Sequence, residues 1–370
     1  MNLVLNEEQE ELQATVRRFL ADRSPLSQVR RVMETPEGHD AALWDRMAGD
    51  LGLPGLTVPE TYGGAGLGQV ELSVVMEELG AALTPSPYLA SAVLGATALL
   101  ATDDEEAKRD LLPGVAAGTT IATLAVAENG GGWDPSAVAA RASLDGGRWV
   151  LDGVKTLVPD GALADLVLVA ARAGDELGLF AVEGGAAGLT RSALAGLDPT
   201  RQLARLELAR TPARRLVSED AAGALRHTMD LAAVALAAEQ LGGLQRCLDR
   251  SVAYAKVRYQ FGRAIGSFQA IKHLLADMHV AMELSRSALR YAAWTADEAP
   301  DELPLAAGVA RASCSEAFFR VAADTIQVHG GIGFTWEHDA HLYYRRAKSS
   351  QLLFGGPRLE RAQLADRLRI

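Results

Sequence analysis

Residues 138–158, VAARASLDGGRWVLDGVKTLV, contain two short apolar segments on either side of a turn. Asp145, Gly146 and Gly147 are residue types that tight hairpins favour, because they adopt positive φ at little cost. Similar segments, TIATLAVAE, ADLVLVAARAGDELGLFAVEG and QLARLELAR, occupy the chain from about residue 119 to 215. No helix-length segment separates them, so the pattern predicts an antiparallel β unit and argues against a Rossmann alternation.

Helical patterns lie on both sides of this β unit. Before it, four segments favour helices: NEEQEELQATVRRFLADR, AALWDRMAGDLGL, QVELSVVMEELGAAL and DDEEAKRDLLPGVAAG. After it, helices are expected at 221–257, 267–297, 303–329 and 337–352. The predicted fold is therefore α+β and multi-domain. It has an N-terminal helical domain (1–118), a middle antiparallel β-barrel or sandwich domain (119–217) and a C-terminal four-helix bundle (218–370).

Length and composition limit the class of protein. The 370 residues are 49% apolar, which is enough for two or three packed domains. Apolar runs such as LAAVALAA at 231–238 fall far short of the roughly 18 residues that a membrane helix needs. A net charge of −11 argues against a nucleic-acid surface. With no signal-peptide pattern and only Cys247 and Cys314, a cytoplasmic protein without membrane insertion is expected.

Residue patterns that would indicate other chemistry are absent from the sequence. Ser251 and His273 lack the spacing of a nucleophile and its base, which argues against a hydrolase. His329, His338 and His341 are near one another, but a zinc site needs more ligands, so no metal is predicted. HGGIGFTW lacks the third glycine of a dinucleotide fingerprint, and ENGGGWDP lacks the Lys-Ser/Thr of a P-loop.

Three longer motifs indicate a family. VPETYGGAGLGQVELSVVMEELG resembles the helical-domain motif of acyl-CoA dehydrogenases. RYQFGRAIGSFQAIKHLLADM (258–278) and QVHGGIGFTWEHDAHLYYRRAK (327–348) resemble the bundle motifs of the same family. The motifs occur in the family's order, on the same α-β-α plan, so the chain is identified from end to end as resembling this family.

The resemblance implies an FAD enzyme that acts on an acyl-CoA thioester. In the family, a base removes the α-proton while the β-hydride passes to the flavin, and a dimer holds the FAD between its subunits. Dimers pair into tetramers, and an electron-transfer flavoprotein is the expected acceptor. Such chemistry requires a carboxylate near the substrate α-carbon and donors near the thioester carbonyl.

The residues that reach the neighbouring subunit's FAD in the family are present. Arg258 and Phe261 match the R-x-x-F-G motif, in which the arginine pairs with the pyrophosphate, as a guanidinium fork suits. Gln269 follows at the next helix start. Gln327, Gly330 and Gly331 match the Q-x-x-G-G motif, where glycine lets the backbone approach a cofactor closely.

The residues that contact the same subunit's flavin in the family are largely replaced. The usual TEP-x-AGSD loop corresponds to AENGGGWD (127–134), with Ala127 in place of a hydrogen-bonding threonine. The usual W-I-T strand corresponds to Leu157, Val158 and Pro159. Proline has no N–H to donate, and neither leucine nor valine replaces the hydroxyl.

The catalytic base of the family is also missing. In the Y-E-G-T alignment its glutamate falls on Phe354, or on Gly355 with a one-residue gap. The alternative position, on the first bundle helix, is Ala232. Glu239 is a weak candidate, because it lies about 10 Å further along that helix on nearly the same face. A buried Glu239 paired with a neighbour is the favoured interpretation, so the catalytic residue is unknown.

Two hypotheses of different class are open, and the retained Arg258, Phe261 and Gln327 argue against the second of them. In the first, the chain is an FAD-dependent acyl-CoA dehydrogenase that is either self-sufficient, in a homo-oligomer, or the base-lacking subunit of an α2β2 hetero-tetramer. Subunits of lipid or steroid catabolism resemble the latter arrangement. In the second, it is a flavin-free structural or acyl-CoA-binding protein. A related flavin oxidase or monooxygenase is a third possibility, and the identity of the acyl group does not follow from the sequence.

Overall fold

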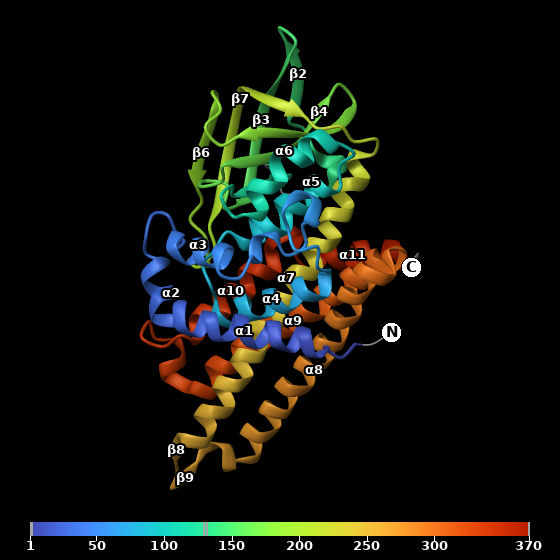
Figure 1. The fold of residues 1–370 in the computed structure, drawn as a ribbon. Helices are drawn as coiled ribbons and strands as arrows, with labels where there is room; N and C mark the ends of the chain where they lie inside the picture. Colours follow the sequence, from blue (N-terminus) through green and yellow to red (C-terminus); the bar gives the residue numbers. More distant parts are fainter. Residues whose placement is uncertain (1–2, 129, 131, 369–370) are drawn as a thin grey trace. The chain divides into compact units, whose positions relative to one another are not determined.

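The computed structural model describes residues 3–128, 130 and 132–368 (Figure 1). Its contacts divide the chain into two compact units. The helical unit comprises residues 1–31, 69–84 and 233–370, and the sheet unit comprises residues 32–68 and 85–232. The boundaries at residues 118 and 217 stay a prediction, since the N-terminal segments are distributed over both units.

Seven strands form the sheet unit's core. They are β1 (Ala122–Ala125), β2 (Arg141–Asp145), β3 (Arg148–Pro159), β4 (Leu166–Ala173), β5 (Glu176–Glu183), β6 (Leu189–Ala193) and β7 (Leu203–Arg215). The strand order is β1-β4-β2-β3-β7-β5. Because β4 also pairs with β5, the strands from β4 to β5 form a closed ring. Its interior is apolar, with Leu151, Val169 and Phe180 fully buried.

The predicted hairpin is confirmed, but the sheet is mixed. β2 and β3 pair antiparallel around Gly146 and Gly147, whose φ values are +56° and +82°. β4, however, pairs parallel with β1 and also with β2. A parallel pairing needs a crossover, and residues 126–165 between β1 and β4, which include β2 and β3, are long enough for one. An alternating pattern of apolar residues does not reveal which strand becomes the neighbour.

The sheet unit also carries helices. These are α3 (Ala41–Gly49), α5 (Ala96–Leu100), α6 (Glu105–Ala116) and a π-helix at Leu89–Gly95, the last lying beside β1. Trp44 of α3 is buried and donates from its indole nitrogen to the carbonyl of Gly118 at 2.8 Å. The sequence pattern did not predict the π-helix or α5.

The helical unit contains α1 (Glu7–Arg23), most of α2 (Leu26–Val32), α4 (Gln69–Ala82), α8 (Gln269–Glu298), α9 (Leu303–His329), α10 (Ala340–Leu352) and α11 (Gly356–Leu368). It also contains α7 (Ala221–Val257) from Ala233 onward. Four long C-terminal helices were expected, and α7 to α10 confirm them. No helix was predicted after residue 352, but the structure has one more, α11, which begins after a sharp bend that follows α10. Pro357 lies in its first turn, where proline is compatible with a helix.

α4 and α7 cross with their backbones in contact. Both carry the pattern Glu-x-Leu-Gly, at 77–80 and 239–242. A Cβ added to Gly80 would overlap the carbonyl of Glu239, and one added to Gly242 would overlap the carbonyl of Glu77. The two glycines therefore permit a helix separation that any side chain would prevent.

Polar side chains stabilise the ends and the interior of this helical unit. Asn6 and Gln9 form a capping box at the start of α1. Asp297 of α8 accepts from the backbone N–H groups of Gln69 and Val70, at 2.7 and 3.0 Å, and so caps α4. Inside the unit, buried Glu77 pairs with Arg290 of α8 at 2.6 Å.

Candidate functional site

A groove of about 400 Å³, here called the tip groove, lies where α7 ends and α8 begins. The hairpin β8 (Tyr259–Gln260) and β9 (Arg263–Ala264) connects these helices and is labelled in Figure 1. The groove is lined by Tyr254, Arg258, Gln260, Phe261, Ile265, Phe268, Ile271, Val328, His329, Gly330 and Gly331. A mainly apolar and aromatic lining with one guanidinium suits a ligand that combines a flat ring with an anionic group.

The structure brings four of the six predicted FAD contacts together at this groove. Arg258, Phe261, Gly330 and Gly331 line it. Gln269 begins α8 and Gln327 lies in the last turn of α9, and both are exposed outside the lining. The role of these residues in binding FAD stays a prediction.

Phe261 is presented to solvent in a strained conformation. Its φ is +51° and its side chain is 91% exposed, although it is a large apolar residue. The ring meets Phe268 edge-on at 6.1 Å, and the guanidinium of Arg263 lies over Phe268 at 4.0 Å. A strained and exposed aromatic residue is typical of a contact that a further molecule completes.

The two glycines leave open space beside the groove. Gly330 has a φ of +64°, which explains glycine at this position. Gly331 has no positive φ, and an added Cβ would meet nothing within 4 Å. Packing within the described chain therefore does not require glycine at 331. The open space fits the close approach of a cofactor or of another chain.

His329 lines the tip groove, and the sequence analysis assigned no role to it or to His338 and His341. His329 stacks on Tyr254 at 4.4 Å and meets His338 at 4.5 Å. Its Nδ1 donates to the carbonyl of Thr325 at 2.8 Å, if that nitrogen carries the proton. Burial lowers the pKa of His329, His338 and His341, and the nearby Arg250 lowers that of His329 and His338 further. The position of His329 inside Q-x-x-G-G was the one sequence signal that could have identified it.

Because of these three histidines, we expect acidification to destabilise the fold. Because their folded-state pKa is lowered, the native state binds fewer protons than the unfolded state below the ordinary value of 6.5. The free energy of unfolding is therefore expected to fall between about pH 7 and pH 5.5. His329→Phe keeps a ring beside Tyr254 but cannot titrate, so chemical denaturation should show a flatter dependence on pH.

In the sheet unit, the segments that correspond to the family's own-flavin contacts lie beside each other. The N–H of Thr156 donates to the carbonyl of Ala127 at 2.9 Å, which joins the loop 127–134 to β3. Ala127, Val158 and Pro159 are buried, and Leu157 has a φ of +54° at a bulge in the β3–β7 pairing. Asn129 and Gly131 of this loop lie outside the described residues.

A buried ion pair links the same two segments. Lys155 of β3 is fully buried, and its Nζ lies 2.6 Å from Glu128 and 3.1 Å from the carbonyl of Val126. Glu128 also accepts from the backbone N–H groups of Ala139 and Ala140, at 2.9 Å each. Burial lowers the pKa of Lys155 against the opposing effect of Glu128. This carboxylate therefore closes the loop between β1 and β2, a role that the sequence analysis did not identify.

The positions aligned with the family's base offer no carboxylate. Phe354 is 6% exposed, has a φ of +63° and packs under the guanidinium of Arg311 at 5.6 Å. Ala232 is fully buried in α7. Glu239, the weak candidate, is 5% exposed and pairs with buried Arg346 of α10 at 3.2 Å. A buried paired carboxylate matches the favoured structural interpretation of Glu239.

Among the described residues, no group of three or more His, Cys, Asp or Glu side chains could hold a metal ion. Within the same part of the chain, no helix combines the length and the apolar character that crossing a bilayer requires.

Known proteins resemble this chain over its whole length. Residues 6–119, 123–209 and 222–369 match the models of the acyl-CoA dehydrogenase N-terminal, middle and C-terminal domains. The chain is 37% identical over 358 residues to acyl-CoA dehydrogenase IpdE2 of Mycobacterium tuberculosis, covering 95% of this chain and 94% of that one.

Solved structures agree with these matches. A variant of the "Tcur3481-Tcur3483 steroid ACAD" is 35% identical, with a TM-score of 0.88 and 98% of each chain covered. The ChsE4-ChsE5 complex from Mycobacterium tuberculosis is 30% identical, with a TM-score of 0.90 and coverage of 100% and 99%. Members of the family are FAD-dependent oxidoreductases that act on CH–CH bonds. The chain belongs to the acyl-CoA dehydrogenase family.

Proposed function

We propose that the chain takes part in the α,β-desaturation of an acyl-CoA thioester as the base-lacking subunit of a heteromeric, FAD-dependent dehydrogenase. The observation that carries this proposal is an asymmetry. Groups that suit another chain's dinucleotide meet at the tip groove. The positions aligned with a base and with the chain's own flavin contacts hold Phe354, Ala232 and Leu157–Pro159.

The tip groove supplies binding groups for part of an FAD. Among the described residues that line it, Arg258 carries the one guanidinium, which would offset the charge of a pyrophosphate. The backbone of Arg258 is held on both sides, since its N–H donates to Tyr254 at 2.9 Å and its carbonyl accepts from Ile265 at 2.8 Å. Phe261 and the open space at Gly331 complete the contact. When bound, FAD supplies the acceptor for the substrate's β-hydride.

Under this proposal, a carboxylate of another chain accepts the α-proton of the substrate. Phe354 carries no group that accepts a proton, and its ring is packed beneath Arg311. Glu239 is held by Arg346 inside the helical unit, which favours a charge paired for stability. The partner would therefore be a second acyl-CoA dehydrogenase chain that contains the base, with an electron-transfer flavoprotein as acceptor.

Similar proteins suggest the class of substrate and the assembly. One solved relative is described as a steroid ACAD with a two-part name, and another as a complex of two differently named chains. For the present chain, an acyl-CoA of lipid or steroid catabolism and an α2β2 tetramer are the corresponding proposals.

The proposal is tested by flavin content. The chain expressed alone should be colourless and inactive, whereas the complex with its partner should carry FAD. In that complex, Arg258→Ala should lower bound FAD at least tenfold, measured by flavin absorbance after gel filtration. Lys256→Ala removes the same charge two residues earlier and should retain the flavin.

Two outcomes contradict the proposal. A lone chain that is yellow with stoichiometric FAD and reduces a dye with an acyl-CoA is self-sufficient. Unchanged flavin in the Arg258→Ala complex would instead favour a flavin-free structural role.

A further inference from the structure

A carboxylate near the tip groove is held by arginines from two different helices. Asp339 directly precedes α10, and its side chain accepts from Nε of Arg30 on α2 at 2.9 Å and from Nη2 of Arg250 on α7 at 3.0 Å. The three side chains are only 21–26% exposed, so water screens these ion pairs less than it screens a pair at the surface. Burial opposes the ionised form of Asp339, but the two guanidiniums hold the pKa of its carboxyl below the usual range. The chain just before α10 is therefore tied to α2 and to α7 at once.

Asp339 occupies a position where an aspartate usually caps its own helix. The residue at the start of a helix commonly accepts from one of the first free backbone N–H groups. Within α10, all of which the structure describes, no N–H donates to the Asp339 side chain. Nδ1 of the neighbouring His338 accepts from the N–H of Ala340 instead, at 3.2 Å. The carboxylate thus bonds to Arg30 and Arg250 rather than to the helix end.

The segment between α9 and α10 depends on this carboxylate for its position. Ile332, Phe334 and Trp336 are 48%, 72% and 61% exposed, so the large side chains of the segment bury little area. Gly330 and Gly331 stand at its beginning, with open space beside both. A segment with few buried apolar contacts is placed mainly by the polar contacts at its end.

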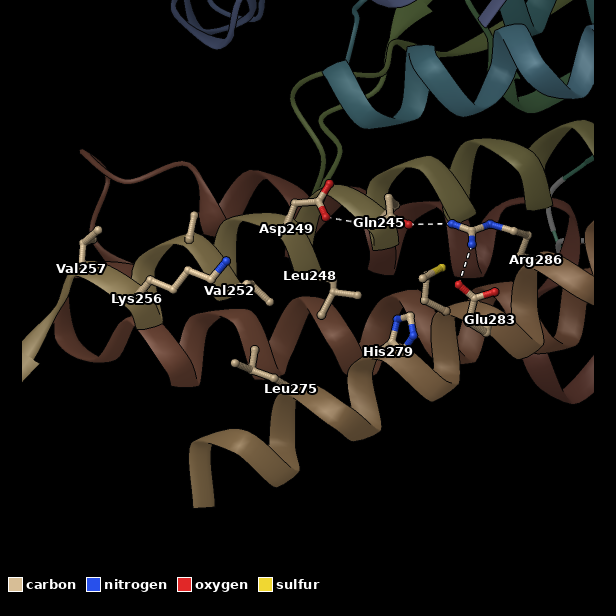
Figure 2. A pocket seen from close by; sticks show the side chains of 12 residues that line it. Gln245, Leu248, Asp249, Val252, Lys256, Val257, Leu275, His279, Glu283 and Arg286 are labelled. Carbon is tan, nitrogen blue, oxygen red and sulfur yellow. Dashed lines mark hydrogen bonds and ion pairs between the residues drawn. The ribbon is translucent and has the colours of Figure 1, made fainter. Parts of the chain in front are cut away.

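The contacts that begin at Asp339 return to the helix that carries Arg250. His338 directly precedes Asp339 and meets the ring of His329 at 4.5 Å, and His329 stacks on Tyr254 at 4.4 Å. Tyr254 lies four residues after Arg250, so both project from the same face of α7. Figure 2 shows the α7 residues of another face, which line a separate groove toward α8 and include neither Arg250 nor Tyr254. Asp339, His338, His329, Tyr254 and Arg250 therefore form a closed circuit of contacts.

We propose that Asp339 is a positioning residue of the tip groove. By fixing His338 against His329, it holds the two stacked rings that line the groove, those of His329 and Tyr254, in the arrangement that receives FAD. Asp339 itself is not part of the lining and acts through the two histidines. This role rests on the proposed function, because the groove is taken to bind FAD.

The affinity for FAD in the complex with the partner, followed by flavin fluorescence, tests the proposal. Asp339→Asn keeps the size of the side chain but removes the charge that faces two guanidiniums, and should raise the dissociation constant for FAD about tenfold. Asp339→Glu keeps the carboxylate and should retain most of the affinity. Glu78→Gln is the matched control, since Glu78 is 6% exposed and bound by Arg17 at 2.7 and 3.0 Å in the same helical unit, outside the tip groove. This control should weaken the fold and bind FAD as the wild type does.

A second measurement reports on the histidine rings without any flavin. Burial is the largest cause that lowers the pKa of His338, whereas the charge of Asp339 raises it. If Asp339 holds His338 in place, Asp339→Asn releases the ring to water, and the pKa of His338 should rise toward its ordinary value of 6.5. If Asp339 acts only as a nearby charge, the same variant should lower that pKa. NMR titration of the chain alone, labelled at its histidine carbons, distinguishes the two results.

The proposal is overturned if Asp339→Asn binds FAD normally while Arg258→Ala loses it, if Glu78→Gln loses as much affinity as Asp339→Asn, or if the pKa of His338 falls in Asp339→Asn. These results leave the proposed function intact, because Arg258→Ala tests the groove itself. Unchanged flavin in the Arg258→Ala complex contradicts the proposed function and the role of Asp339 together.

Discussion

The Glu128→Gln variant is expected to lose about 3–5 kcal/mol of unfolding free energy, because it leaves a buried ammonium without its carboxylate. Lys155 is fully buried, and Glu128 is the carboxylate that lies 2.6 Å from its Nζ. The same carboxylate accepts from two backbone N–H groups at the end of the loop, so its loss also weakens the attachment of that loop. Urea denaturation followed by tryptophan fluorescence measures the change.

The dependence on pH identifies the cause of this loss. Burial already lowers the pKa of Lys155, and removal of Glu128 should lower it further. The native state then binds fewer protons than the unfolded state below the ordinary lysine pKa of 10.5. The stability of Glu128→Gln should therefore rise from neutral pH toward about pH 10.

The Lys155→Met variant is the matched control. It removes the charge but leaves Glu128 with its backbone donors and 18% of its side chain exposed, so it should cost clearly less than Glu128→Gln. The double variant should be more stable than Glu128→Gln alone. If the two single changes cost the same and add in the double variant, the ion pair is not what stabilises this loop.

The Gly242→Ala variant is expected to lose about 3 kcal/mol, because the new methyl group overlaps the α4 backbone. Its neighbour is the carbonyl of Glu77, a rigid main-chain group that cannot move as a flexible side chain can. Gly80→Ala meets the carbonyl of Glu239 and should behave alike. Each change forces α4 and α7 apart and disturbs the buried Glu77–Arg290 and Glu239–Arg346 pairs.

A glycine at the surface provides a control that distinguishes steric overlap from the ordinary effect of replacing glycine by alanine in a helix. An added Cβ at Gly49 of α3 meets nothing within 4 Å, so Gly49→Ala should be neutral or slightly stabilising. Thermal unfolding of the three variants makes the comparison. Gly242→Ala with wild-type stability would show that α4 and α7 cross at a greater distance than described.

Several elements could be predicted from local sequence because their signals are local. The helices 221–257 and 303–329 begin and end where the pattern places them, since apolar period and helix-end residues lie within each segment. The turn at Gly146 and Gly147 is set by the same kind of signal. The parallel β1–β4 pairing has no local signal, because any apolar strand of suitable length can occupy that position.

In the tip groove, too, some residues could be identified from local sequence and others are brought together only by packing. Arg258 and Phe261 lie close together in the chain and form one motif, so the sequence identified them together. Tyr254 and His329 are distant in the chain, and only packing of α7 against the end of α9 stacks their rings. Likewise, the sequence could state that Glu239 is a carboxylate on α7, but not that Arg346 of α10 neutralises it.

The sequence by itself determined the α-β-α order, the family motifs and the absence of a carboxylate at Phe354 and Ala232. These properties depend on residue type and short spacing. Only the tertiary structure decided which buried charges pair and how closely α4 and α7 approach. Those depend on distances between segments far apart in the chain, which the packing of the whole helical or sheet unit sets.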